Sequence, residues 1–304
     1  MGRRVTVRRV VEREPDGRLR QGDVVGELAG LDAQTAVIES RAGLVEVPLA
    51  LVTAARLALP STADELALEG IVAQGLQPLE TYALGGWTLR ADHGFTRRAN
   101  SALPLRQPGL PLDEMLGRAH GWYARRGLPL KIQVPTEARR LLDAELAERG
   151  WPADARTHVF AARLDALISP ATPSVAPAEL SARPDDAWLS LYRGGAGLEP
   201  PARDLLTRHF HAAFASVRLD GRVAAVGRGV VDQGWLGVMA LEVDPAHRRH
   251  GLGAAVMAAL WEWGRTQGAT RSYLTVLAEN SAAVALYEKL GYWVHHDYHY
   301  RAEP

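Results

Sequence analysis

An arginine- and glycine-rich loop between an apolar strand and an amphipathic helix constrains the fold of this 304-residue chain more than any other feature. Residues 248–253 read RRHGLG, the preceding strand is predicted over Trp235–Val243, and the helix over Gly251–Gln267. Glycine lets the backbone approach a ligand closely, and the unpaired N–H groups and dipole of a helix start favour an anion. The loop is therefore typical of a diphosphate site, with an ordinary glycine-rich chain reversal as the alternative interpretation.

A strand and a second helix follow this loop. The strand is predicted over Arg271–Leu277, and a helix over Ala282–Leu290 is capped by Asn280 and ended by a glycine. Asn280 and Tyr287 are two helical turns apart, so both side chains face the same side of the helix. Two closing strands are predicted over Tyr292–Val294 and His296–Arg301.

In this order the motifs resemble the GNAT superfamily, the acyl-CoA-dependent N-acetyltransferases. The resemblance covers about Asp185 to Arg301 and depends on the strand end Leu241–Pro245, the loop 248–253 and residues 280–292. It implies an α/β fold with a mixed central sheet flanked by helices. The whole chain is also similar to actinobacterial-type GNAT proteins, which carry a small SH3-like β-barrel before a tandem, partly degenerate GNAT repeat.

Composition agrees with an intracellular enzyme. The length predicts two or three domains, and the absence of cysteine excludes disulfides and a cysteine acyl-enzyme. The chain has 35 basic and 35 acidic residues, so no global field favours nucleic acid or an anionic membrane. Because the sequence has neither a long apolar run nor a signal-like start, we expect a cytoplasmic protein without a membrane partner.

Sequence patterns divide the chain into four segments. Residues 1–60 contain short β-branched runs between turn residues, which predict the small SH3-like β-barrel. Residues 61–165 are predicted to be a degenerate GNAT-like half, 166–184 a proline-spaced linker, and 185–304 the acyl-CoA-binding catalytic domain. Arginines on the first strand could bind nucleic acid, but acidic neighbours and the lack of aromatic residues favour a scaffold or interaction role.

The second segment repeats the fourth in degraded form. Trp122–Gly127 has the same spacing as Trp263–Gly268, and in both copies another glycine, Gly150 or Gly291, follows 23 residues later. Helices are predicted over Leu112–Arg126 and Glu137–Arg149, and strands over Lys131–Val134 and Thr157–Leu164. A chance coincidence of helical spacing is the alternative to a repeat.

At the repeat offset of 141 residues, the polar residues expected to bind acyl-CoA in the fourth segment correspond to residues of other types in the second. Tyr287 corresponds to Leu146, and Asn280 corresponds to Arg139. The loop lies near 106–111 in the second segment, where prolines have no N–H to offer a phosphate. The second segment is therefore predicted to keep the packing pattern without turning over acyl-CoA.

The resemblance implies acetyl-CoA as co-substrate, without a metal. Amides beside the strand ending at Val243 would bind the pantetheine arm and the thioester oxygen. Tyr287 would protonate the departing sulfur, or else it is a packed core tyrosine; Glu242 would accept the amine proton, or else it is an outward-facing carboxylate. The residues expected to bind acetyl-CoA are Leu241, Val243, Arg248, Arg249, Gly251, Leu252, Gly253, Ala254, Asn280 and Tyr287.

We expect the acceptor to bind between residues 185–208 and the last strands, against Trp188, Tyr192 and Trp293. Gly194–Gly197 offers either a flexible break for a closing loop or a simple helix-to-helix connection. No acidic cluster dominates this stretch, so a polycationic acceptor is not favoured. Many peptide-N-terminus acetyltransferases of the superfamily carry a glutamate at the position of Thr275, and this departure disfavours ribosomal-protein N-terminal acetylation.

A group of histidines near the C-terminus suggests a metal site as a further hypothesis. His295, Asp297 and His299 share one face of an extended strand, with His296 beside them. Because the sequence identifies no outside ligand, an ordinary exposed or groove-lining strand is favoured over a metal site.

The sequence therefore predicts an N-acetyltransferase that moves an acetyl group from acetyl-CoA to a primary amine by direct nucleophilic attack. The acceptor is a small molecule or a peptide or protein amine, and neither its identity nor the oligomeric state follows from the sequence. The alternative is an acyl-CoA-binding regulatory or scaffold protein without significant turnover. Release of free CoA thiol distinguishes the two.

Overall fold

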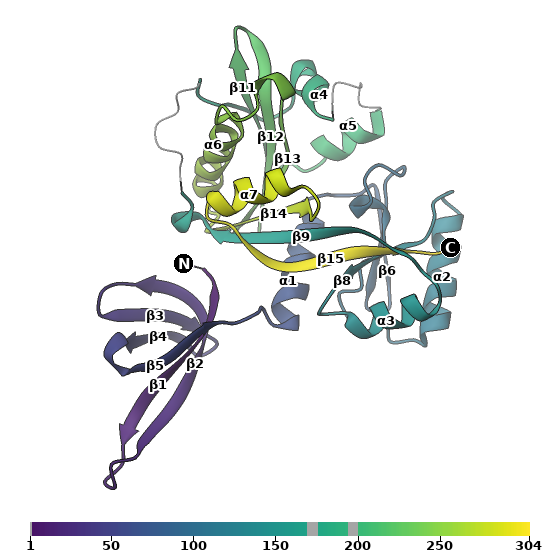
Figure 1. The fold of residues 1–304 in the computed structure, drawn as a ribbon. Coiled ribbons are helices and arrows are strands. Elements are labelled where there is room, and N and C mark those ends of the chain that lie inside the picture. The colour runs from purple at the N-terminus through teal and green to yellow at the C-terminus, as the bar shows by residue number, and fades with distance from the viewer. Residues whose placement is uncertain (1, 169–175, 194–199) are drawn as a thin grey trace.

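The computed structural model describes residues 2–168, 176–193 and 200–304. These residues form a five-stranded N-terminal sheet and a larger α/β body built on an eight-stranded sheet (Figure 1). Within the described ranges, no helix has the length and apolar character needed to cross a membrane.

The N-terminal sheet is antiparallel with the strand order β4-β3-β2-β1-β5. Its strands are β1 (Arg4–Arg13), β2 (Leu19–Leu31), β3 (Thr35–Ser40), β4 (Gly43–Pro48) and β5 (Val52–Leu57). A small core of valines with Ile38 holds the sheet together. Strands β4 and β5 form its two edges, so the sheet is open and does not show the closed SH3-like barrel that the sequence predicted.

The first part of the α/β body comes from residues 61–166. Its helix α1 begins with a capping box, in which Ser61 and Asp64 bond each other's backbone N–H groups. Its elements are α1 (Thr62–Gln74), β6 (Glu80–Leu84), β7 (Trp87–Ala91), α2 (Leu112–Ala124), β8 (Lys131–Pro135), α3 (Arg140–Glu148) and β9 (Ala153–Arg163).

The second part comes from residues 176–304. Its elements are β10 (Glu179–Ser181), α4 (Asp186–Leu191), α5 (Pro200–Thr207), β11 (Ala212–Leu219), β12 (Arg222–Asp232), β13 (Trp235–Val243), α6 (Leu252–Thr266), β14 (Arg271–Leu277), α7 (Ser281–Lys289) and β15 (Trp293–Ala302). The segment 166–184, expected to be a linker, contains strand β10, which pairs with β11. Residues 169–175 of this segment lie outside the described ranges. The predicted closing pair is one strand, β15, with a register shift between Val294 and His296 that absorbs the break in the pattern.

The two parts exchange their last strands. The large sheet has the order β10-β11-β12-β13-β14-β9-β15-β8, so β9 of the first part lies between β14 and β15 of the second. Reciprocally, β15 pairs with β8 of the first part. Figure 1 shows β9 and β15 side by side through the middle of the molecule. Thr157 of β9 opposes Tyr298 of β15, a position 141 residues later in the chain.

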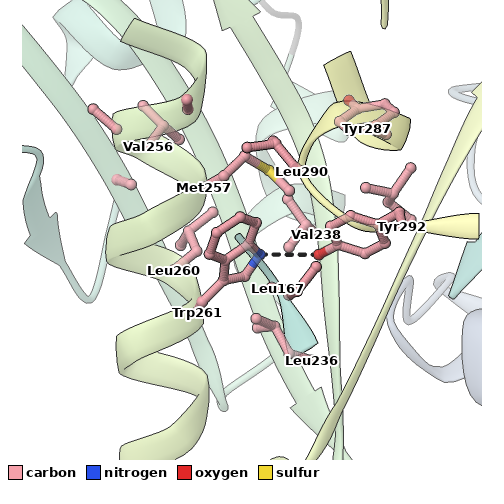
Figure 2. Packing of buried hydrophobic residues seen from close by; sticks show 14 of the residues in the cluster. Leu167, Leu236, Val238, Val256, Met257, Leu260, Trp261, Tyr287, Leu290 and Tyr292 are labelled. Carbon is pink, nitrogen blue, oxygen red and sulfur yellow. Dashed lines mark hydrogen bonds between the residues drawn. The ribbon is translucent and has the colours of Figure 1, made fainter. Parts of the chain in front are cut away.

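The largest hydrophobic core lies between this sheet and the helices α6 and α7. Trp261 of α6 is completely buried, and its indole N–H donates to the Tyr292 hydroxyl at 2.9 Å (Figure 2). Phe160 of β9 belongs to the same core and lies 5.9 Å from Tyr287, measured between ring centroids. Since a fully buried aromatic side chain contributes about 1.5–3 kcal/mol, the core of the second part depends on a strand from the first.

The exchange predicts that the second part does not fold alone. A fragment of residues 176–304 exposes the edges of β14 and β15 and lacks Phe160, so we expect it to aggregate or remain unfolded. The fragment 61–304 should unfold cooperatively with a Tm near that of the full chain. Circular dichroism during heating checks both fragments at matched concentration. A cooperative transition of the 176–304 fragment at the full-chain Tm contradicts this dependence.

Candidate active site

The loop before α6 presents backbone N–H groups to solvent. Gly251 precedes the helix with φ 82°, and Arg249 is also left-handed with φ 67°. The first intrahelical bond runs from the Ala255 N–H to the Gly251 carbonyl at 3.0 Å, so the amides before Ala255 have no helical partner. Among the described residues no side chain caps α6, and its first turn carries no acid. This helix start suits an anionic group.

The other loop residues surround these amides. Leu252 and Ala254 are buried, whereas the side chains of Arg248 and Arg249 are exposed. Arg248 Nε donates to the Val243 carbonyl at 3.3 Å, which ties the loop to the end of β13.

Gly253 brings α6 against two neighbouring elements. A Cβ added there would lie 3.5 Å from Val243 Cγ2 and 3.6 Å from Leu286 Cδ2, which is ordinary van der Waals contact. The helix start therefore lies beside the end of β13 and against α7.

Strands β13 and β14 separate halfway along their length. Their parallel pairing covers Trp235–Val238 and Arg271–Leu274 and stops there. Immediately afterwards Ala240 has φ 54°, at a register shift against β12. Such a bulge bends its strand, so β13 diverges from β14 toward the loop before α6.

The separation exposes main-chain amides of β13. The Asp244 N–H bonds the Ala224 carbonyl of β12 at 2.9 Å. Because successive amides alternate in direction along a strand, the N–H groups of Leu241 and Val243 face the gap between β13 and β14. These are the two amides that the sequence assigned to acetyl-CoA.

A pocket of about 220 Å³ opens beside this gap. The second part lines it with Met239 and Ala240 of β13, residues 275–277 of β14, and Tyr192 at the end of α4. Tyr298 and Tyr300 of β15 and residues 95–98 of the first part also line it. The pocket is thus assembled from both parts of the body.

Glu242 faces the side of the sheet that carries the pocket. Its neighbours Leu241 and Val243 pack against the α6 core, and side chains alternate across a strand. Glu242 Oε2 accepts the backbone N–H of Arg193 at 2.7 Å, at the rim of the pocket. The predicted flexible break, Gly194–Gly197, follows directly and lies outside the described residues.

Tyr287 of α7 is buried beside Phe160 and Tyr292, whose ring centroids lie 5.9 and 6.2 Å away. Figure 2 shows Tyr287 close to Tyr292. Burial raises the pKa of its phenol to about 12, so the hydroxyl stays protonated at neutral pH. Asn280 is the N-cap of α7 and accepts the Ala283 N–H at 3.2 Å. Its exposed amide NH₂ group remains available to a ligand.

The structure brings one of the three expected acceptor residues, Tyr192, to the pocket. Trp188 is a core residue that donates its indole N–H to the Ala215 carbonyl at 2.9 Å. Trp293 lies at the start of β15, where it lines a separate pocket of about 390 Å³ against α1 and the N-terminal sheet.

His295 and His296 contact each other through their Nδ1 atoms at 2.8 Å, and the other contacts of the C-terminal histidines are with separate carboxylates. His296 Nε2 contacts Glu69 at 2.9 Å, and His299 contacts Asp143 at 2.7 Å. Asp297 contacts His158 at 2.6 Å. Within the part of the chain that the structure describes, no group of three or more His, Cys, Asp or Glu side chains could hold a metal ion.

Sequence reasoning missed the three pocket-lining arginines, of which Arg98 and Arg193 have no ion-pair partner among the described residues. Arg98 lies in the part interpreted as degenerate, and nothing local indicates that its loop reaches the other part. Arg193 adjoins the predicted glycine break, which was the available signal for it.

Strands β13 and β14 diverge beside a helix start with free backbone N–H groups, and this arrangement is the GNAT fold. A solved GCN5-related N-acetyltransferase from Kribbella flavida matches with TM-score 0.62 and 21% identity, covering 79% of this chain and 95% of that one. A tandem GNAT protein from the clavulanic acid biosynthesis pathway matches with TM-score 0.56 and 14% identity over 81% of this chain and 90% of its own. Both likenesses concern the fold.

Residues 62–301 match the family model described as "Probable histone acetyltransferase Rv0428c C-terminal". The probable histone acetyltransferase Rv0428c of Mycobacterium tuberculosis is 31% identical over 99% of this chain and 94% of its own length. The chain belongs to this family and is a CoA-dependent N-acyltransferase of the GNAT superfamily.

Proposed function

We propose that the enzyme transfers the acetyl group of acetyl-CoA to a primary amine by direct attack. The observation that carries the proposal is the contact of the α6 start with the end of β13 at Gly253. A diphosphate held by the free amides of α6 would direct its pantetheine arm into the gap between β13 and β14. The thioester would then lie beside the pocket of about 220 Å³.

The site supplies the groups that the reaction needs. The amine nitrogen attacks the thioester carbonyl carbon, a C–N bond forms, and the carbonyl electrons move to oxygen. The N–H groups of Leu241 and Val243 face this gap and would stabilise the oxyanion, at about 3 kcal/mol per donor. Glu242, on the pocket side of β13, would accept the proton that the nitrogen loses, directly or through one water.

Collapse of the oxyanion breaks the C–S bond, and the electron pair leaves on sulfur. Tyr287 would donate its proton to this sulfur, giving the amide and free CoA thiol. A phenol with its pKa near 12 is a weak acid toward a thiolate, so its donation contributes modestly. Glu242 then returns the proton taken from the amine to the phenolate through solvent.

We propose further that residues 61–165 are a degenerate copy of the catalytic half. Helix α3 begins at Arg140 and α7 at Ser281, which is the repeat offset. The start of α2 differs from that of α6, because its N-cap is Pro111 and its first turn carries Asp113 and Glu114. These acids repel a diphosphate, which supports the loss of acyl-CoA binding from this copy.

Replacing Gly251 tests the diphosphate site. Gly251→Val should weaken acetyl-CoA binding at least tenfold, because a side chain strains the left-handed backbone and disturbs the amides. The control is Gly268→Val, at the other end of α6 with the same φ of 82°. Calorimetric titration measures both affinities. Equal affinities of the two variants would remove the proposed site, and binding without CoA release would instead favour a regulatory role.

Replacing Tyr287 tests the proton donor. Tyr287→Phe should lower kcat about tenfold, since a thiolate is already a fair leaving group. Because burial raises the pKa of Tyr287 to about 12, the phenol stays protonated below that pH. The pH–rate profile should therefore show no decline from its ionisation below about pH 10.

The matched control is Tyr123→Phe, since burial also raises the pKa of this distant tyrosine to about 12. Its loss should reduce stability, through the bond to the Arg90 carbonyl, and leave kcat unchanged. An unaltered kcat in Tyr287→Phe assigns that residue to packing alone.

A further inference from the structure

The pocket beside the thioester gap is rich in arginines that lack carboxylate partners. Arg98, which is half-buried, and Arg193 both line it. Arg97 on the same loop has a partner, because it contacts Asp154 at 3.0 Å. Among the described residues no comparable ion pair includes Arg98 or Arg193.

Tyr298 and Tyr300 line the pocket together with Arg98. Burial lowers the pKa of Arg98, but these two phenols raise it. The carboxylate of Glu69 also raises the pKa of Arg98, but it is completely buried and already bonded to His296 at 2.9 Å and Gln133 at 2.7 Å. Arg98 is therefore free to bind an anion that enters the pocket.

Arg193 is held by aromatic faces. Its guanidinium lies 4.7 Å from the ring centroid of Phe95 and 5.7 Å from that of Tyr192. Glu242 accepts its backbone N–H, and among the described residues no acceptor is hydrogen-bonded to its guanidinium. Arg193 and Arg98 come from different parts of the body and meet in this pocket.

A third arginine lies behind the pocket wall. Arg228 of β12 is completely buried beside Met239, with Nη1 donating to the Gly75 carbonyl at 3.1 Å. Its Nε and Nη2 have no partner among the described residues. Burial lowers the pKa of Arg228 to about 10, so it remains charged at neutral pH. In a poorly solvated interior this charge adds to the positive potential of the pocket.

We propose that the acceptor is a small amine that also carries an anionic group, a carboxylate or a phosphate, bound by Arg98 and Arg193. The amine then faces the gap between β13 and β14. This inference rests on the proposed acetyl transfer and names its substrate class. A pocket of about 220 Å³ accommodates a small molecule of this kind, and its arginines repel a polycationic chain.

A panel of matched amines tests the proposal in the full-length enzyme, with release of CoA thiol from acetyl-CoA as the readout. Amino acids are compared with their α-amides, and O-phosphoethanolamine with ethanolamine. A lysine-rich peptide is the cationic arm. We expect the anionic member of at least one pair to have a kcat/KM about tenfold or more above that of its neutral partner. The preferred pair distinguishes carboxylate from phosphate.

Variants then assign the preference to Arg98. Arg98→Gln should reduce the ratio of anionic to neutral kcat/KM to near one, and Arg98→Lys should retain part of it. Arg118→Gln, which removes a remote exposed arginine of α2, should keep the full ratio. The ratio compares two substrates on one variant, so a general loss of stability does not alter it.

The outcomes separate this inference from the proposed function. Acetylation confined to neutral amines or the lysine-rich peptide overturns anionic specificity and leaves acetyl transfer intact. An unchanged ratio of anionic to neutral kcat/KM in Arg98→Gln overturns the assignment of anion binding to Arg98 and also leaves acetyl transfer intact. Binding of acetyl-CoA without use of any anionic amine also overturns the inference. No binding of acetyl-CoA at all removes the proposed function itself.

Discussion

The pairing of β9 with β14 is the interaction on which the rest of this structure depends. It places a strand of the first part inside the sheet of the second, and β15 is placed reciprocally against β8. The second part then has no complete core alone, since Phe160 of the first part packs with its Tyr287. Because of the exchange, the whole α/β body is expected to fold cooperatively, since its long-range strand pairings must form together.

Helix α1 reinforces this union with buried polar contacts. Glu69 lies beneath the sheet without solvent exposure and bonds both His296 of β15 and Gln133 of β8. Directly after α1, the carbonyl of its C-cap Gly75 accepts a hydrogen bond from Arg228 of β12. The buried carboxylate of Glu69 is bonded at both oxygens, and together with the Gly75–Arg228 bond it fixes α1 in one position. The residues after α1 are thereby held at the pocket, and with them the loop that carries Arg98.

Local signals in the sequence were sufficient to predict the elements that depend only on residues close together in the chain. The loop before α6 and the cap at Asn280 follow from glycine, helix-start and capping rules within a few residues, and the structure contains both. The position of Trp293 could not be predicted in the same way, because it depends on which strand pairs with β15. The prediction of a closed barrel was wrong for a related reason. Closure requires the edge strands β4 and β5 to pair with each other, and sequence patterns predict strands more readily than their partners.

The same distinction explains why the proposed diphosphate site can be predicted from the sequence and the proposed acceptor site cannot. A diphosphate is recognised by main-chain amides, and the residues that free those amides must be consecutive in the chain. The pocket proposed for the acceptor is lined by side chains, which the fold gathers from β13, β14, β15 and the loop carrying Arg98. The first part has an acidic, proline-capped helix start in place of a diphosphate site, yet it supplies a wall of the second part's pocket. In the proposed degenerate copy, the loss of donor binding would leave these residues free to specialise in acceptor recognition.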